Sequence, residues 1–314
     1  MAENKPHHPS PRLRPASIVI GSRGSKLALW QANHIADRLR EYGAETRIEI
    51  IKTTGDKIQD VPLAQVGGKG LFTKEIEEAL LSGSIDLAVH SLKDMPTEIP
   101  PGLTLAAIPE REDPRDAMVG AKLADLKHGA RIGTSSLRRA AQLLALRRGF
   151  QVETLRGNVD TRLRKLDEGQ YDAIVLSSAG LRRLGWENRI AEMIPVKVMC
   201  PAVGQGALAI ETRNDGGIAR QFAAALNHEP TQTAVTAERA LLAKLEGGCQ
   251  VPIGAHARVE GRRVRLMAIV ASPDGSRLIR GSARGSAAVA IGTLLADALL
   301  ESGADQILSA VYSA

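Results

Sequence analysis

Hydrophobic positions in the first two thirds of the chain alternate between the periods typical of strands and of helices. Residues 16–21 (ASIVIG) form a short β-branched run that predicts a buried strand. Directly after it, small and apolar residues recur at spacings of four, three and four from Ala28 to Leu39, which predicts a helix closed by Gly43. Residues 46–52 alternate as a second strand.

A second region repeats this arrangement. Residues 131–133 end a strand, and the helix that follows stops near Gly149. Residues 85–91 (IDLAVHS) and 171–177 (YDAIVLS) form another matching pair, each with an Asp before a buried strand that ends in Ser. We therefore expect two similar α/β domains with mainly parallel sheets, whose strand ends face a shared cleft.

The pattern changes after Glu229. A helix over residues 231–245 precedes two strands of alternating character, 251–259 and 264–271. A third strand and a terminal helix over 287–302 complete the chain. This order predicts a small C-terminal α+β domain with an antiparallel sheet.

Composition narrows the location and the class of protein. The chain has 314 residues, enough for two or three domains, and 44 % of them are apolar. Residues 1–15 contain four prolines and no hydrophobic stretch, so we expect a disordered tail without an export signal. No apolar run reaches the ~18–20 residues of a membrane span. Two cysteines far apart fit neither a disulfide framework nor a zinc site, so we expect a reducing, cytoplasmic location.

The formal charge of +6 favours an anionic partner. Arginines recur in pairs after particular predicted strands, as at Arg138-Arg139 and Arg182-Arg183, which is more typical of a pocket lining than of a nucleic-acid patch. The chain also has only eight Phe, Trp and Tyr residues, too few for the base-stacking surfaces of a nucleic-acid binder.

Three basic turns fall within one predicted domain. The first is GTSSLRR, which contains Ser135 and ends at Arg139, at a strand-to-helix junction whose free N–H groups favour anions. The second, LRGNVDTR, contains Arg156 and Arg162, and the third ends in Arg182-Arg183. Each turn alone could be a capped helix with solvated arginines. Together they indicate a ligand with several carboxylates, each suited to a guanidinium group.

Two further segments carry reactive side chains. In HSLKDMP, Lys93 and Asp94 follow a strand, where they could move protons or stabilise a cation, although a surface ion pair is the ordinary meaning of Lys-Asp. In GGCQVP, two glycines leave Cys249 accessible, so a modified thiol and an inert one both stay open, whereas Cys200 has the surroundings of a buried, inert thiol. The glycine-rich residues 67–70 suggest a lid and lack the spacing of a phosphate loop.

Taken together, these segments resemble the porphobilinogen deaminase family from about Ile18 to the C-terminus, in the family's order. The matching pieces are SRGSKLALWQ, GGKGLFTKE, AVHSLKDMP, GTSSLRR, LRGNVDTRL, SSAGLRRLG, PAVGQGALAIE and EGGCQVPIGA. HSLKDMP, GTSSLRR and GGCQVPIG are specific as a set, although each alone would be weak.

The resemblance implies a fold of two domains like those of periplasmic solute-binding proteins, linked by two crossing strands, and a third domain that carries a cofactor cysteine. It implies that the strand in PAVGQGALAIE returns to the first domain. We accordingly expect the tail to be followed by domain 1 (16–110 with 203–226), domain 2 (111–202) and domain 3 (227–314).

The resemblance also implies the activity. The family's members are transferases that join four porphobilinogen molecules head-to-tail into the linear tetrapyrrole hydroxymethylbilane and release ammonia at each coupling. They use a dipyrromethane primer held by a thioether, here to Cys249, with no metal. A monomer is expected, with porphobilinogen as its partner and with neither nucleic acid nor membrane.

The site residues carry over position by position. Asp94 matches the catalytic aspartate, which stabilises a pyrrole-derived cation and moves protons. The positions that hold the primer's acid groups are Lys93, Ser135, Arg138 and Arg139. The positions that bind substrate or the growing chain are Arg23, Ser25, Arg156, Arg162 and Arg183. One departure is Gln65, where many family members have a second lid lysine in addition to Lys69.

The alternative interpretation is a non-catalytic protein of the periplasmic-binding-protein fold that binds an anionic solute or has a regulatory role. It predicts an export signal or a DNA-binding segment, neither of which we identify, and it gives Cys249 no role.

Overall fold

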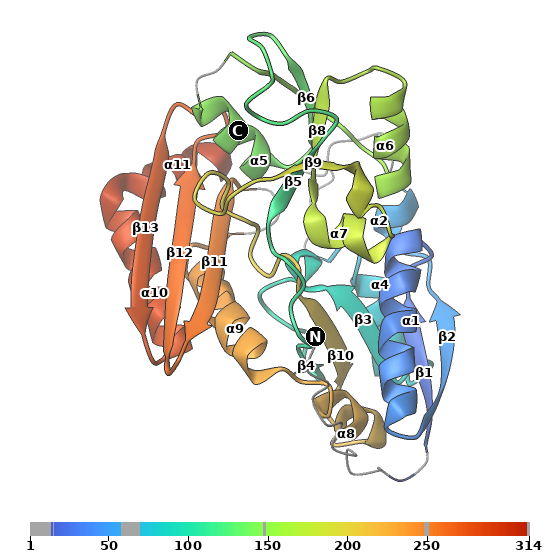
Figure 1. Ribbon diagram of the computed structural model, residues 1–314. Helices are drawn as coiled ribbons and strands as arrows, with labels where there is room; N and C mark the ends of the chain where they lie inside the picture. The colour runs from blue at the N-terminus through green and yellow to red at the C-terminus, as the bar shows by residue number, and fades with distance from the viewer. Residues whose placement is uncertain (1–13, 15, 58–69, 147–148, 248–250, 313–314) are drawn as a thin grey trace, which may run out of the picture.

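The computed structural model describes residue 14 and residues 16–57, 70–146, 149–247 and 251–312. Cys249, Gln65 and Lys69 lie outside these residues, as does the predicted tail apart from Arg14. The described chain contains three sheets, two of five strands and one of three (Figure 1). This arrangement confirms the predicted class, two α/β sheets with a smaller antiparallel one.

The first sheet has the order β2-β1-β3-β10-β4. Its strands are β1 (Ala16–Ser22), β2 (Ala44–Ile50), β3 (Leu87–Ser91), β4 (Leu103–Ala107) and β10 (Leu208–Arg213). Its helices are α1 (Lys26–Glu41), α2 (Thr54–Lys57), α4 (Lys74–Leu81), α8 (Ile218–Ala224) and the 3₁₀ turn η1 (Leu92–Asp94). β1 runs parallel to β2 and β3, whereas β10 runs antiparallel to β3 and β4. A strand late in the chain thus lies inside the sheet built by the N-terminal residues.

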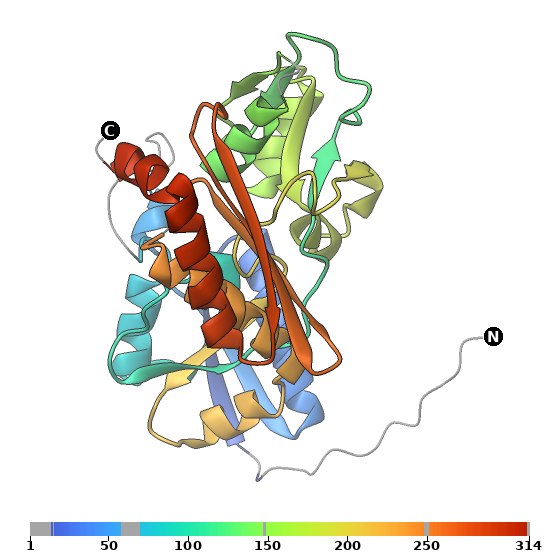
Figure 2. The same ribbon diagram turned by 90° about the vertical axis from the view of Figure 1, so that its left-hand side faces the viewer.

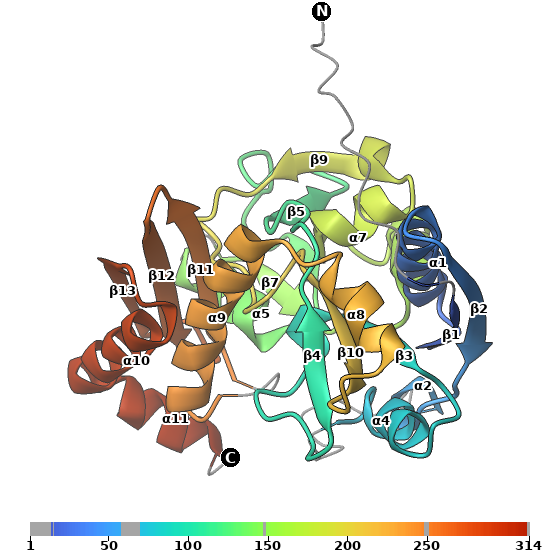
Figure 3. The same cartoon turned by 90° about the horizontal axis from the view of Figure 1, so that it is seen from below.

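Helices cover both faces of this sheet. The predicted apolar stripe of α1 is buried from Ala32 to Leu39 and packs, together with Phe222 of α8, against β1 and β3. On the opposite face, Ile76 and Leu80 of α4 pack against β3 and β4. Figure 3 shows α1 and α8 on one side of the strands and α4 on the other.

The second sheet repeats the design, with the order β7-β6-β8-β5-β9. Its strands are β5 (Asp116–Val119), β6 (Arg131–Gly133), β7 (Gln151–Glu153), β8 (Ala173–Ser177) and β9 (Ile190–Met193). Its helices are α5 (Leu137–Ala145), α6 (Val159–Asp167), α7 (Ser178–Arg183) and the 3₁₀ turn η2 (Glu187–Arg189). β5 runs antiparallel to β8 and β9, so each sheet is mixed, with one reversed strand among neighbours that share a direction.

The paired Asp residues noted in the sequence have the same structural role in both sheets. A carboxylate oxygen of Asp86 accepts the backbone N–H of Val19 at 2.9 Å. A carboxylate oxygen of Asp172 accepts the backbone N–H of Arg131 at 2.7 Å. Each Asp therefore ties the loop before one strand to the neighbouring parallel strand.

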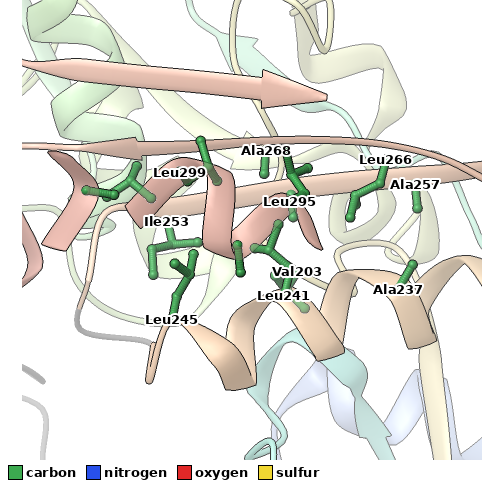
Figure 4. Close-up of a cluster of buried hydrophobic side chains, with 14 of the residues drawn as sticks. Val203, Ala237, Leu241, Leu245, Ile253, Ala257, Leu266, Ala268, Leu295 and Leu299 are labelled. Carbon is green, nitrogen blue, oxygen red and sulfur yellow. The ribbon is translucent and has the colours of Figure 1, made fainter. Parts of the chain in front are cut away.

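The remaining residues build the small antiparallel sheet β11-β12-β13 and its helices. The elements are α9 (Glu229–Lys244), β11 (Ile253–Glu260), β12 (Arg263–Ala271), β13 (Leu278–Gly285), α10 (Ala288–Leu299), a π-helical turn (Leu300–Ala304) and α11 (Asp305–Tyr312). Figure 2 shows α10 and α11 along one side of this sheet, and Figure 4 shows Leu241 of α9, Leu266 of β12 and Leu295 of α10 in the shared core. The predicted terminal helix is α-helical to Leu299 and continues as the π-helical turn, whose residue Gly303 has φ of +96° and marks the kink before the additional helix α11.

Candidate active site

A cavity of about 360 Å³ lies where turns of the first and second sheets meet. The first sheet contributes the β1–α1 turn and the 3₁₀ turn after β3, and the second contributes the β6–α5 turn and the segment that leads into α6. The predicted site residues that line it are Arg23, Ser25, Lys93, Asp94, Ser135, Arg139, Arg156 and Arg162. The structure thus brings together residues that are up to about 140 positions apart in the sequence.

Two helices begin at this cavity. Ser25 caps α1, because its hydroxyl accepts the backbone N–H of Ala28 at 3.2 Å. Ser136 caps α5 in the same way and accepts the N–H of Arg139 at 3.5 Å. Helix N-termini have free N–H groups and a positive dipole end, so both starts favour an anionic ligand.

The turn before α6 requires a glycine. Gly157 has φ of +109°, and a Cβ built on it would lie 2.7 Å from the side chain of Thr161. The Gly157 carbonyl accepts a hydrogen bond of 2.8 Å from Nε of Arg162. The left-handed turn therefore fixes the direction in which the Arg162 side chain leaves the helix.

A buried carboxylate lies behind the cavity wall. Asp116, at the start of β5, is 0 % exposed and contacts both guanidinium groups of the Arg138-Arg139 pair. Oδ2 accepts from Nη1 of Arg138 at 2.7 Å, and Oδ1 accepts from Nε of Arg139 at 2.9 Å. Burial opposes ionisation, but the two guanidinium groups and Gln205 outweigh it and lower the pKa of Asp116 to about 2.

The two arginines of this pair have different surroundings. Nη1 of Arg138 also donates to the Cys200 carbonyl at 2.6 Å, and Arg138 does not line the cavity. Arg139 donates to the Val175 carbonyl at 3.1 Å and does line it. Both arginines were predicted from the sequence to lie at the site. In the structure only Arg139 lines the cavity, and Arg138 lies behind its wall.

The cavity concentrates positive charge. Burial lowers the pKa of Arg162 to about 10, and repulsion from Arg139 and Arg156 adds to the shift. Burial also lowers the pKa of Lys93. The negative charge of Asp94 opposes this shift, and the positive charge of Arg139 adds to it. Nε of Arg156 is buried and has no hydrogen-bond partner within the described residues. These shifts and the unsatisfied donor indicate a site built for a ligand with several negative charges.

Asp94 is one of two carboxylates on the described lining, the other being Asp160. It ends the 3₁₀ turn that directly follows β3, and its side chain is exposed to the cavity. Its negative charge opposes the lowering of the pKa of both Lys93 and Arg162, so it lies within electrostatic reach of each.

Family models match most of the chain. Residues 18–220 match the model described as porphobilinogen deaminase, dipyromethane cofactor binding domain, and residues 232–301 match the porphobilinogen deaminase C-terminal domain. The chain belongs to the porphobilinogen deaminase family.

Relatives cover nearly the whole chain. The porphobilinogen deaminase of Geobacter metallireducens is 53 % identical over 306 residues, which are 96 % of each chain. That of Brevibacillus brevis is 50 % identical over 298 residues, 93 % of this chain and 96 % of the relative. Among solved structures, a TRAP periplasmic solute binding protein from Desulfovibrio salexigens is 12 % identical with a TM-score of 0.41, covering 68 % of this chain and 73 % of that one.

Family membership establishes the activity. The protein is a transferase of porphyrin and heme biosynthesis that polymerises porphobilinogen into hydroxymethylbilane with the aid of a dipyrromethane cofactor. The alternative of a non-catalytic solute-binding or regulatory protein is not favoured. Within the described residues, no helix combines the length and apolar character needed to cross a membrane.

Arg183 of this porphobilinogen deaminase family member is not among the residues that line the 360 Å³ cavity. It lines a second cavity, of about 610 Å³, with Trp30, Glu112 and Arg182. Its Nη2 donates to the Gly206 carbonyl at 2.7 Å. Burial lowers the pKa of Arg183 to about 10, and the Glu112 carboxylate opposes that shift.

The residues that hold the site's framework were not predicted from the sequence. Besides Asp116, these include Glu238 of α9, which is fully buried. Its Oε1 lies 2.6 Å from Nη1 of Arg111, with which it forms an ion pair. Glu238 also accepts the backbone N–H groups of Gly204 and Ala257, each at 2.7 Å, and thus joins the third sheet to the segment before β10. Asp116 could have been found, because it is the first residue of a buried strand, close to the position that the two repeated Asp residues have directly before theirs.

Proposed function

We propose that porphobilinogen is coupled in the 360 Å³ cavity, with Asp94 as the catalytic group. The supporting observation is the placement of Asp94 at a strand end among Lys93, Arg139 and Arg162. A carboxylate within this cationic lining opposes the repulsion that a positively charged reaction intermediate would meet there.

The chemistry follows from this charge distribution. The carboxylates of substrate and growing chain are bound by Arg23, Ser25, Arg156 and Arg162. The buried Nε of Arg156 has no hydrogen-bond acceptor within the described residues, and a ligand carboxylate would supply one. Loss of ammonia from the aminomethyl group leaves a cation delocalised onto the pyrrole nitrogen. Asp94 stabilises this cation and accepts a hydrogen bond from the pyrrole N–H. It also moves protons as bonds form and break.

The residues of the cavity also fit the dipyrromethane cofactor. Lys93, Ser135 and Arg139 line the cavity and would hold its acid groups, while Cys249 would carry the thioether. When bound, the cofactor supplies the pyrrole to which the first substrate is joined. For Arg138 we propose an indirect contribution, since it fixes Asp116 and through it Arg139. Arg183 would contact the growing chain from the second cavity.

We further propose the three domains expected from the sequence, 16–110 with 203–226, 111–202 and 227–314, on the basis of the three sheets. A cytoplasmic location fits the two distant cysteines of the chain, of which Cys200 is buried with its pKa raised by burial to about 12, and the family resemblance supports a monomer.

Intact mass and turnover test the proposal together. The purified protein should consume porphobilinogen and should exceed its chain mass by two coupled pyrroles. Cys249→Ala should lack this excess, whereas Cys200→Ala, at the buried cysteine, should keep it. An unmodified protein that is nevertheless fully active would contradict the assignment of Cys249.

A further inference from the structure

An ion pair crosses the cavity between its two sides. Lys26 is the first residue of α1, directly after the capping Ser25, and Asp160 lies in the first turn of α6. Nζ of Lys26 is 3.4 Å from Oδ2 of Asp160, and both residues line the cavity. Because α1 belongs to the first sheet and α6 to the second, this contact joins the two halves of the site.

The pair is well exposed, unlike Arg139 of the same cavity, which is buried. The side chains of Lys26 and Asp160 are 70 % and 40 % exposed. Exposed ion pairs of this kind contribute little to stability, because water competes for both charges and the long side chain loses freedom. A carboxylate brought by a ligand can therefore replace Asp160 as the partner of Lys26 at small cost.

Asp160 has an unfavourable position for a site that binds acids. Its carboxylate shares the lining with Arg156 and Arg162, which are proposed to bind carboxylates of the substrate. An unpaired negative charge there would repel each incoming acid group. Pairing with Lys26 removes that repulsion, and a ligand that takes over Lys26 would be opposed by Asp160 again.

We infer that Lys26 is a further binding residue for a carboxylate of porphobilinogen or of the growing chain, and that Asp160 competes with this carboxylate for it. The inference rests on the proposed function of the cavity. Lys26 extends the cationic lining to its exposed edge, while Asp160 limits how tightly an acid is held there. A site that must release its contacts as the chain lengthens benefits from such a limit.

Steady-state kinetics of single and double variants test the inference. Lys26→Met should raise KM for porphobilinogen about three- to tenfold, with a smaller effect on kcat, and Lys26→Arg should restore most of the affinity. Asp160→Asn should lower KM about twofold or more, since it frees Lys26. The double variant should fall between the two single variants, and all differences should shrink at high salt.

A matched pair elsewhere provides the control. Nζ of Lys244 lies 3.3 Å from Oδ1 of Asp297, with side chains 47 % and 46 % exposed, and neither residue lines the cavity. Lys244→Met and Asp297→Asn should leave KM unchanged. Cofactor loading by intact mass and urea midpoints should be compared for every variant.

The outcomes separate the possibilities. A raised KM in Lys26→Met assigns the carboxylate to incoming substrate, whereas an unchanged KM with accumulated enzyme-bound intermediates assigns it to the growing chain. If neither changes, or if Asp160→Asn raises KM as Lys26→Met does, the pair is only structural and the inference is wrong. A parent protein that does not consume porphobilinogen would instead contradict the proposed function itself.

Discussion

Asp116→Asn tests the framework behind the cavity most directly. The substitution keeps the shape of the side chain but removes the charge that faces two buried guanidinium groups. Arg138 and Arg139 are each about 5 % exposed, so water cannot replace the lost carboxylate. We expect a large loss of stability together with displacement of Arg139 from the cavity wall.

The magnitude follows from the pKa. The native structure lowers the pKa of Asp116 from 3.8 to about 2, and at 1.36 kcal/mol for each unit this corresponds to about 2 kcal/mol of stability from ionisation. Removing one partner of a buried ion pair typically costs ~3–5 kcal/mol, because the remaining charge stays unpaired. Two unpaired guanidinium groups remain after the substitution. We therefore expect the free energy of unfolding at neutral pH to fall by ~3–5 kcal/mol.

The same pKa predicts how the effect depends on pH. Because the pKa of Asp116 is lower in the folded than in the unfolded protein, its contribution is complete above pH 4 and is lost as the pH falls towards 2. The difference in unfolding free energy between the parent protein and Asp116→Asn should therefore be constant from pH 7 to about 5 and should decrease below pH 4.

Urea unfolding followed by circular dichroism measures this difference. Asp274→Asn is the control, because the pKa of Asp274 is also lowered to about 2, by hydrogen bonds from Ser272 and Ser276, although Asp274 is fully exposed. The control should change stability little. If Asp116→Asn unfolded at the same urea concentration as the control, the argument from buried charge would fail.

Three further predictions concern the chemistry. Asp94→Asn should lower turnover by ~10²–10⁴ at full cofactor loading, and Asp94→Glu should retain more activity; an Asn variant within a few-fold of the parent would move the catalytic role elsewhere. Cys249→Ala, lacking the cofactor, should melt at a lower temperature than the loaded parent, since a ligand bound only to the folded state stabilises it; equal melting temperatures would refute this. Arg156→Leu and Arg162→Leu should each accumulate partly elongated chains, resolved by intact mass, and normal turnover in both would remove them from the site.

Much of the fold follows from local patterns. The apolar stripe of α1 and the paired Asp residues are local features, so the sequence predicts both α/β sheets. The position of β10 between β3 and β4 depends on pairing across more than 100 residues, which periodicity does not encode. The resemblance to the family supplied that strand, and the residues alone did not.

The site shows the same limit in its charged residues. Arg138 and Arg139 are adjacent and give one signal in the sequence, yet only Arg139 lines the cavity. The difference arises from Asp116 and from the Cys200 carbonyl, which approach from distant parts of the chain. Which member of an arginine pair reaches a ligand is therefore decided by long-range packing.

The buried carboxylates of the protein have a different task from Asp94 and Asp160, which line the cavity. Asp116 and Glu238 are fully buried, stay ionised against the cost of burial and fix arginines in the framework. The cavity is lined by several cationic groups, and repulsion from Arg139 and Arg156 adds to the burial that lowers the pKa of Arg162. A ligand with several carboxylates offsets the repulsion among these guanidinium groups when it binds, which favours binding. Binding should accordingly raise the pKa of Arg162 and Lys93 towards their ordinary values, because each new carboxylate favours the charged form of its neighbours.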